Sequence, residues 1–162
     1  MISNGLLSAI RLQYRLDWHG MHGVSHWARV RVNGLRLSAS SGADPIVVEL
    51  FSFLHDSCRL NDNRDLEHGH RAAELALRFQ GQHFTLNDRQ LNQLTTACRD
   101  HTHGVETCDP TIATCWDADR LDLWRVGIQP DPDRLLTALA KSPVFMNCAI
   151  ERSRRWLEQL PC

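Results

Sequence analysis

Lysine is almost missing from this sequence. Lys141 is the only one, and arginine supplies nearly all of the cationic charge. The planar fork of arginine suits phosphate, although a biased base composition of the genome would produce the same imbalance. The formal net charge is -1. This near-neutral balance argues against a general nucleic-acid-binding protein, because such domains normally carry a basic face.

Paired cysteines and long apolar runs are missing as well. The six cysteines form no CxxC pair and show no spacing typical of a disulfide framework, so we expect reduced thiols in an intracellular protein. The first ten residues lack the charged start and apolar core of a signal peptide. No run approaches the roughly 18 apolar residues that a membrane span needs. We therefore expect a cytoplasmic protein with no membrane partner.

Period-two strand patterns, repeats and low-complexity tracts are also absent, while apolar residues recur at helical spacing, which predicts an all-α fold. The length of 162 residues suits one domain with a real core rather than two. Helical segments are predicted at residues 6–14, 24–35, 45–59, 67–79, 88–100, 110–124, 135–141 and 143–157. The helices within 132–158 are expected to pack on the rest of a single domain covering residues 1–162.

One apolar run, from Ile46 to Leu54, ends directly in His55 and Asp56 (PIVVELFSFLHDSCR). Because apolar residues cover nearly every face of this segment, we expect a buried helix that delivers both polar side chains to a place with little water. Burying an ionised carboxylate without a partner costs roughly several kcal/mol. The pair therefore predicts a bound cation or a dense hydrogen-bond network.

Nine histidines are spread unevenly along the chain. His26, His55, His68 and His101 each lie in or beside a predicted helix that has an apolar face. A single histidine on such a face is usually a hydrogen-bonded core residue. Several on successive helices can instead converge on one point, which is how helical bundles build metal sites.

The order and spacing of these residues resemble those of the HD-domain superfamily of metal-dependent phosphohydrolases. The resemblance covers about residues 18–128 and is carried by HWARV, the HD pair, and WDADRLDLWRVG. It implies that a first divalent ion is held by four ligands, namely His26, His55, Asp56 and Asp119. Asp117 is the fallback for the last ligand. Asp122 shares a helix face with Asp119 and is expected to orient a ligand imidazole.

A second metal ion is implied by the two-metal members of the superfamily, whose added histidines match His68 and His101 here. The alternative is that these two side chains only bind substrate phosphate or orient water. His70 and His103 are less favoured, because each lies two residues from the better candidate and points elsewhere in a regular backbone.

The candidate catalytic residues implied by the resemblance are Asp56, Arg59 and Glu67. Several single-metal members carry a glutamate where this chain has Arg59, and arginine here favours the two-metal branch. Its alternative interpretation is an exposed side chain at a helix end, where the helix dipole favours a cation. Asp62 is an alternative to Glu67 as the general acid or base. Three further arginines are expected to bind the substrate phosphate: Arg29, Arg71 and Arg120.

The resemblance implies hydrolysis of a phosphoester by metal-activated water, on a nucleotide or another small phosphorylated metabolite. Mixed imidazole and carboxylate ligands suit Mn, Fe, Co, Ni or Zn, with one or two ions per chain. Two alternatives stay open: an oxygenase-like enzyme with two iron ions, and a catalytically silent module that senses a nucleotide. The chain is expected to be a monomer or a homodimer.

Overall fold

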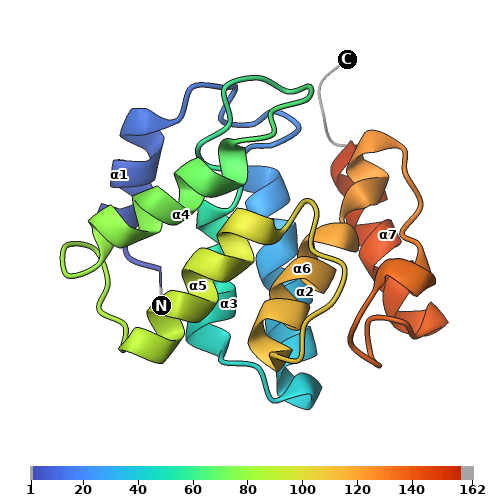
Figure 1. The fold of residues 1–162 in the computed structure, drawn as a ribbon. Coiled ribbons are helices and arrows are strands. Elements are labelled where there is room, and N and C mark those ends of the chain that lie inside the picture. The colour runs from blue at the N-terminus through green and yellow to red at the C-terminus, as the bar shows by residue number, and fades with distance from the viewer. Residues whose placement is uncertain (1, 158–162) are drawn as a thin grey trace.

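The computed structural model describes residues 2–157, which form seven α-helices and two 3₁₀ helices (Figure 1). No β-sheet occurs among these residues, where the only β-type pairing is one isolated bridge between Gln80 and Phe84. The prediction of an all-α fold is therefore confirmed. The helices are α1 (Asn4–Gln13), α2 (Val24–Ser41), α3 (Pro45–Leu54), α4 (His68–Phe79), α5 (Asp88–Asp100), α6 (Pro110–Arg120), η1 (Leu123–Val126), η2 (Pro132–Arg134) and α7 (Pro143–Leu157).

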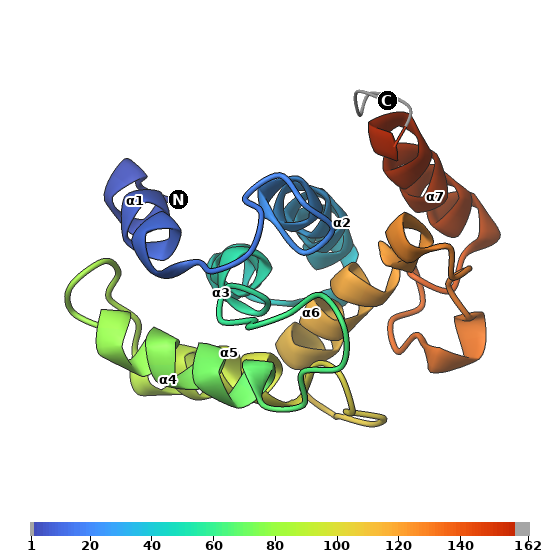
Figure 2. The same ribbon diagram turned by 90° about the horizontal axis from the view of Figure 1, so that it is seen from above.

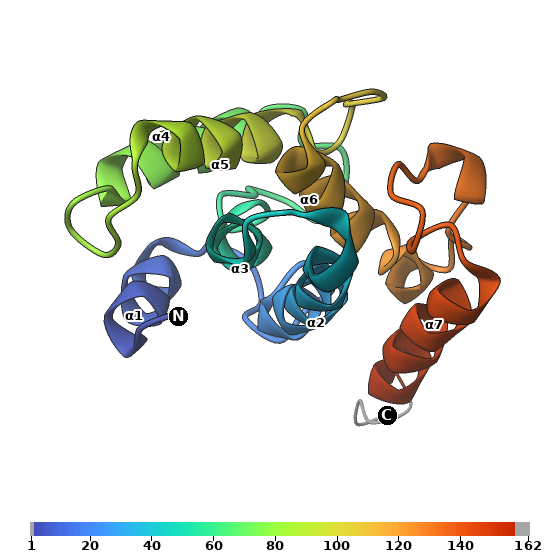
Figure 3. The same cartoon turned by 90° about the horizontal axis from the view of Figure 1, so that it is seen from below.

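Helix α3 lies at the centre of the fold. Its side chains from Val47 to Leu54 are all buried, and α2, α4, α5 and α6 all contact it. Figures 2 and 3 show α3 between the α4–α5 pair on one side and α1 and α2 on the other. The apolar run in the sequence thus becomes the core helix, and the residues that follow it end in the interior.

Helix α7 packs at the edge of the molecule against α2 and η1 (Figure 1). A small second core forms there, made by Leu37, Leu121, Leu135, Ala140 and Ala149. In the described part of the chain no helix combines the length and the apolar character that crossing a membrane would require.

Helices α3 and α5 begin where the sequence predicts, at residues 45 and 88. Asp44 accepts a hydrogen bond from the backbone N–H of Ile46 at 2.9 Å, directly before Pro45. Asn87 and Gln90 form a reciprocal capping box at the start of α5. In both cases a side-chain oxygen satisfies an N–H group that has no partner inside the helix, so these residues predict helix starts for a physical reason.

The predicted helix ends agree less well with the structure. α3 stops at Leu54, and His55 and Asp56 lie in the turns that follow, so the helix predicted over 45–59 is too long. α2 continues to Ser41, beyond the predicted range of 24–35. The segment predicted over 110–124 divides into α6 and η1.

The helix predicted over 135–141 does not form. Leu135 has an extended backbone, with φ -89° and ψ 150°. The Asp117 carboxylate accepts hydrogen bonds from the backbone N–H groups of Leu136 and Thr137, at 2.9 and 2.7 Å. These bonds tie Leu136 and Thr137 to α6, directly after the extended residue Leu135.

Candidate metal centre

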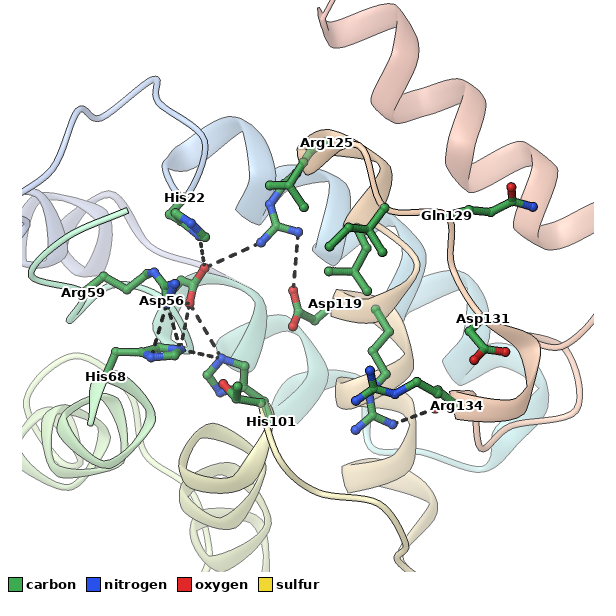
Figure 4. Close-up of a pocket in the computed structure, with 15 residues that line it drawn as sticks. His22, Asp56, Arg59, His68, His101, Asp119, Arg125, Gln129, Asp131 and Arg134 are labelled. Carbon is green, nitrogen blue, oxygen red and sulfur yellow. Dashed lines mark hydrogen bonds and ion pairs between the residues drawn. The ribbon is translucent and has the colours of Figure 1, made fainter. Parts of the chain in front are cut away.

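The six residues predicted as metal ligands come from five different helical regions and meet in the interior. His26 lies on α2, His68 begins α4 and Asp119 lies on α6. His55 and Asp56 follow α3 directly, and His101 follows α5. Figure 4 shows His68, His101, Asp56 and Asp119 turned toward one another at one side of a cavity. The imidazoles of His26 and His55 have no exposed surface.

The first cluster consists of His26, His55, Asp56 and Asp119. The two imidazole Nε2 atoms lie 3.1 Å apart. Oδ2 of Asp56 is 3.6 Å from Nε2 of His26 and 3.9 Å from Nε2 of His55. Oδ1 of Asp119 is 3.4 and 3.6 Å from the same two nitrogens. Four potential donor atoms from three helical regions thus face one small volume.

The hydrogen bonds at the other ring nitrogens fix the proton positions in this cluster. Nδ1 of His26 donates to Oδ2 of Asp122 at 2.7 Å, and Nδ1 of His55 donates to the carbonyl oxygen of Phe51 at 3.1 Å. In a neutral imidazole the second nitrogen then carries a lone pair. The two Nε2 atoms therefore face each other as acceptors. Two lone pairs at this distance repel each other, whereas both could coordinate a bound cation.

The second cluster consists of Asp56, His68 and His101. Oδ1 of Asp56 lies 3.2 Å from Nε2 of His68 and 3.7 Å from Nε2 of His101. The two Nε2 atoms are 2.9 Å apart. Nδ1 of His101 donates to the carbonyl oxygen of Cys98 at 2.7 Å, and Nδ1 of His68 donates to that of Asp65. Again two nitrogens with lone pairs face each other.

Asp56 belongs to both clusters, and each of its oxygens faces one pair of imidazoles. Two sets of three residues have ligand atoms all within 4.8 Å of one another: His26, His55 and Asp56, and Asp56, His68 and His101. Either set could hold a metal ion. Oδ1 of Asp119 is buried and has no hydrogen-bond partner. A buried oxygen without a partner is rare, and coordination of a cation would satisfy it. The donor atoms therefore fit a divalent ion.

The protonation states also suit a cation. Burial alone would raise the pKa of Asp56, but the neighbouring His55, His101, His22 and His68 outweigh burial and hold that pKa well below its usual range. Asp119 behaves in the same way, with His26 and His55 overcoming its burial to lower the pKa. Burial and the charge of Arg125 lower the pKa of His26. Ionised carboxylates, and a neutral imidazole such as that of His26, are the forms that bind metals.

Asp122 supports the first cluster from behind. Besides accepting from His26, its carboxylate pairs with both Nε and Nη2 of Arg29, at 2.7 and 2.9 Å, and accepts from Ser153 of α7 at 2.5 Å. Burial opposes ionisation, but hydrogen bonds from His26 and Arg29 prevail and lower the pKa of Asp122 to about 2. A fixed carboxylate of this kind orients a ligand imidazole and sets its tautomer.

The choice between Asp117 and Asp119 is also clear in the geometry. Besides the backbone of Leu136, Asp117 binds both the N–H and the hydroxyl of Thr137, each at 2.7 Å. Burial raises the pKa of Asp117. Its oxygens hold the loop after η2, so only Asp119 faces the histidines.

Two of the three arginines expected to bind substrate phosphate lie elsewhere. Arg29 is engaged by Asp122 and does not line the cavity next to the ligands. Arg71 donates to the carbonyl of Cys58 at 3.1 Å and to Asp65 at 2.5 Å, and it also lies outside that cavity. Arg120 does line it. Of the three, only Arg120 therefore reaches the cavity, because helical phase from sequence does not decide which side of a helix meets the site.

Of the candidate catalytic residues outside the ligand set, one lines the cavity and one does not. Arg59 lines the cavity, and its Nη1 lies 3.3 Å from the ring nitrogens of His68. Glu67 is exposed, precedes α4 and does not line the cavity, and Asp62 is exposed too. The expectation that Glu67 is catalytic is therefore not supported by its position. His70 and His103 are both exposed, in line with their lower ranking.

Two site residues were missed by the sequence analysis, His22 and Arg125. Nδ1 of His22 lies 2.9 Å from Oδ2 of Asp56. The Nη atoms of Arg125 lie 3.9 Å from Asp56 and 4.0 Å from Asp119 (Figure 4). His22 precedes His26 by four residues, a spacing that could have suggested it. No local pattern marks Arg125, because it enters the site from a 3₁₀ turn.

The cavity beside the two clusters has a volume of about 280 Å³. Leu123, Val126 and Ile128 form an apolar part of its wall, and Gln129, Asp131 and Arg134 lie at the end farthest from Asp56 in Figure 4. Four arginines line it in total, which are Arg59, Arg120, Arg125 and Arg134. Comparisons of this chain with protein-family models, with curated proteins and with solved structures found no match.

Proposed function

We propose that this protein is a metal-dependent phosphohydrolase that acts on a nucleotide or another small phosphorylated metabolite. One observation carries the proposal: two His/Asp clusters share Asp56, and they lie beside a cavity lined by four arginines. The clusters suit divalent ions, and the arginines suit a substrate with several anionic oxygens.

The ligand set divides into two groups around Asp56. His26, His55, Asp56 and Asp119 would hold one ion, and Asp56, His68 and His101 would hold the other. Imidazole and carboxylate donors suit Mn, Fe, Co, Ni or Zn. When bound, such ions supply Lewis acidity and a water molecule of lowered pKa.

Arg125 is the chain's best-placed group for binding a phosphate. Its Nε donates to the carbonyl of Met21 and its Nη1 to that of Asp122, both at 3.2 Å, so the guanidinium is fixed. It is buried beside the oxygens of Asp56 and Asp119 and lines the cavity. A fixed planar guanidinium at this place can hold two phosphate oxygens at once.

His22 replaces Glu67 as the candidate for proton transfer. Its imidazole lines the cavity and is held against Oδ2 of Asp56 at 2.9 Å. An imidazole at this position is placed to give a proton to a leaving oxygen. Arg59 donates from Nη2 to the carbonyl of Asn63 and lies 3.8 Å from Asp56, so it contributes a second positive charge beside the ligands.

The lining of the cavity favours a phosphorylated substrate over the oxidative alternative. An oxygenase with two iron ions would use the same ligands but has no need of four arginines around a neutral organic substrate. The volume of about 280 Å³ suits a small metabolite. The apolar wall made by Leu123, Val126 and Ile128 can contact the organic part of such a molecule.

The test combines metal analysis with a substrate panel. Protein purified without added metal is analysed for its metal content and assayed against nucleotides and small phosphoesters. We expect turnover that a chelator abolishes, and loss of both metal and turnover in Asp56→Ala. Turnover by a metal-free Asp56→Ala variant would contradict the proposal. Iron in the protein together with oxygen consumption, and no phosphate release, would favour the oxygenase.

A further inference from the structure

A second cavity, of about 160 Å³, shares Arg59 with the cavity beside the metal ligands. It is bounded by the end of α1, the segment after α3, and α4. The lining residues are Gln13, Arg15, Cys58, Arg59, Leu60, Arg71, Glu74 and Arg78. None of the metal ligands is among them, so this cavity is separate from the candidate metal centre.

The lining of this cavity carries an excess of positive charge. Four of its eight residues are arginines, and Glu74 is the only acidic one. Arg71 is engaged by Asp65 and by the carbonyl of Cys58. Within the part of the chain that the structure describes, Arg15 and Arg78 form no ion pair within 4.0 Å. Like charges collected around a concave surface favour an anion between them.

Arg59 adds a second, independent observation. The residue is only 9 % exposed. Its Nη1 contacts His68 and lies 3.8 Å from Oδ1 of Asp56, and its Nη2 donates to the carbonyl of Asn63 at 3.3 Å, but its Nε is buried without a hydrogen-bond partner. A buried donor on a charged group that is left unpaired is costly, and a bound acceptor removes that cost.

We propose that this second cavity binds the phosphate group of a small anion, separately from the substrate at the metal ligands. Arginine forks match phosphate oxygens bidentately, and Arg71 is already held in place by neighbouring atoms. The occupant would lie against Arg59, which also contacts His68 of the second metal cluster (Figure 4). This binding does not require turnover, so it stands or falls independently of the proposed hydrolase activity.

Cys58 provides a local readout, because it lines the second cavity and is partly exposed. The full chain, as purified, is treated with iodoacetamide at alkaline pH, since burial raises the pKa of the Cys58 thiol. Alkylation of each cysteine is followed by peptide mass spectrometry over a series of inorganic phosphate concentrations. We expect phosphate to slow alkylation of Cys58 several-fold and to leave the exposed Cys108 and Cys148 unchanged.

Substitution of the two exposed arginines tests the assignment. In the double variant Arg15→Gln, Arg78→Gln, the phosphate concentration that half protects Cys58 should rise by about tenfold or more, because two charge-assisted contacts are lost. The matched control is Arg36→Gln, Arg155→Gln, which removes the same charge from exposed positions outside both cavities. In this control, phosphate should protect Cys58 at the same concentration as in the wild type.

Titration calorimetry with inorganic phosphate on the same three proteins gives a second measurement, which does not depend on the reactivity of Cys58. Parallel series with pyrophosphate and AMP identify the source of the phosphate. Tighter protection by AMP that still depends on Arg15 and Arg78 would indicate a nucleotide, and equal or tighter protection by inorganic phosphate would indicate the free ion. The proposal is overturned if phosphate neither protects Cys58 nor gives binding heat that the double substitution reduces.

Discussion

The Nε2 atoms of His26 and His55 lie 3.1 Å apart, although the hydrogen bonds at Nδ1 leave a lone pair on each of them. The same holds for His68 and His101, at 2.9 Å. Two buried lone pairs at such short separations repel each other. The fold therefore assembles donor atoms at a cost that a bound cation would remove, so that metal binding would be coupled to stability.

The first prediction concerns this coupling. A divalent ion that binds the folded chain alone stabilises it by about 4 kcal/mol when its free concentration is about 1,000 times the Kd. We expect a chelator to lower the melting temperature of the purified protein clearly, and readdition of Mn²⁺ or Zn²⁺ to restore it. Differential scanning fluorimetry measures both. An unchanged melting temperature through both steps would mean that the clusters bind no metal.

The second prediction separates two neighbouring aspartates. Asp119→Asn should weaken metal binding, because Oδ1 of Asp119 faces the two imidazoles of the first cluster. Asp117→Asn should keep the metal but unfold more easily, because Asp117 accepts hydrogen bonds from the backbone of the loop after η2. Metal analysis and urea unfolding of both variants give the comparison. Metal loss from the Asp117 variant alone would reverse the assignment.

The sequence predicts the elements that depend on local chemistry. Pro45 after Asp44, and Asn87 with Gln90, mark helix starts because their effect acts within one turn. The buried helix before His55 is equally predictable, because its apolar residues cover nearly every face. The helix predicted over 135–141 fails for the opposite reason. Its backbone is held by Asp117, about twenty residues away, and no local pattern reports such a contact.

The candidate site follows the same division. Six predicted ligands meet, because each is tied to a helix whose buried face the sequence reveals. The positions of the arginines are harder to predict, since a long side chain can reach either side of its helix. Arg29 pairs with Asp122, while Arg125 enters from a short 3₁₀ turn that has no amphipathic pattern. Tertiary contacts decide which cation faces the cavity.

The third prediction tests whether two ions bind. His101→Ala removes a ligand from the second cluster only. We expect its metal content to fall from about two ions per chain to about one, since the first cluster keeps all four of its donors. His103→Ala, two residues away and exposed, should keep the full content. Quantitative elemental analysis of both variants decides. About one ion per chain in both would leave only the first cluster as a metal site, and about two in both would show that His101 is not a ligand.

The fourth prediction is a pH dependence that comes from Asp122. Its folded pKa of about 2 lies below the ordinary value of 3.8, so ionised Asp122 contributes stability above pH 3.8 that disappears as the pH falls toward 2. The shift corresponds to about 2 kcal/mol. In the presence of a chelator, Asp122→Asn should be less stable than the wild type at neutral pH, and this difference should shrink below about pH 4. Urea unfolding at a series of pH values measures it, and a constant difference down to low pH would contradict it.

The last prediction addresses substrate binding. Arg125 is fixed by two backbone carbonyls and faces the oxygens of Asp56 and Asp119, so its loss removes a charge where we place the phosphate. With a substrate found by the phosphoester panel, Arg125→Gln should lower kcat/KM by about 100-fold, the effect of losing roughly 2.7 kcal/mol of charge-assisted binding. Arg89→Gln, on the exposed surface of α5 and outside this cavity, should leave kcat/KM unchanged. Steady-state kinetics at constant metal content compares the two. Equal kinetics in both variants would show that the phosphate lies elsewhere in the cavity, and Arg134→Gln would then be the next substitution to measure, because Arg134 lines the end farther from Asp56.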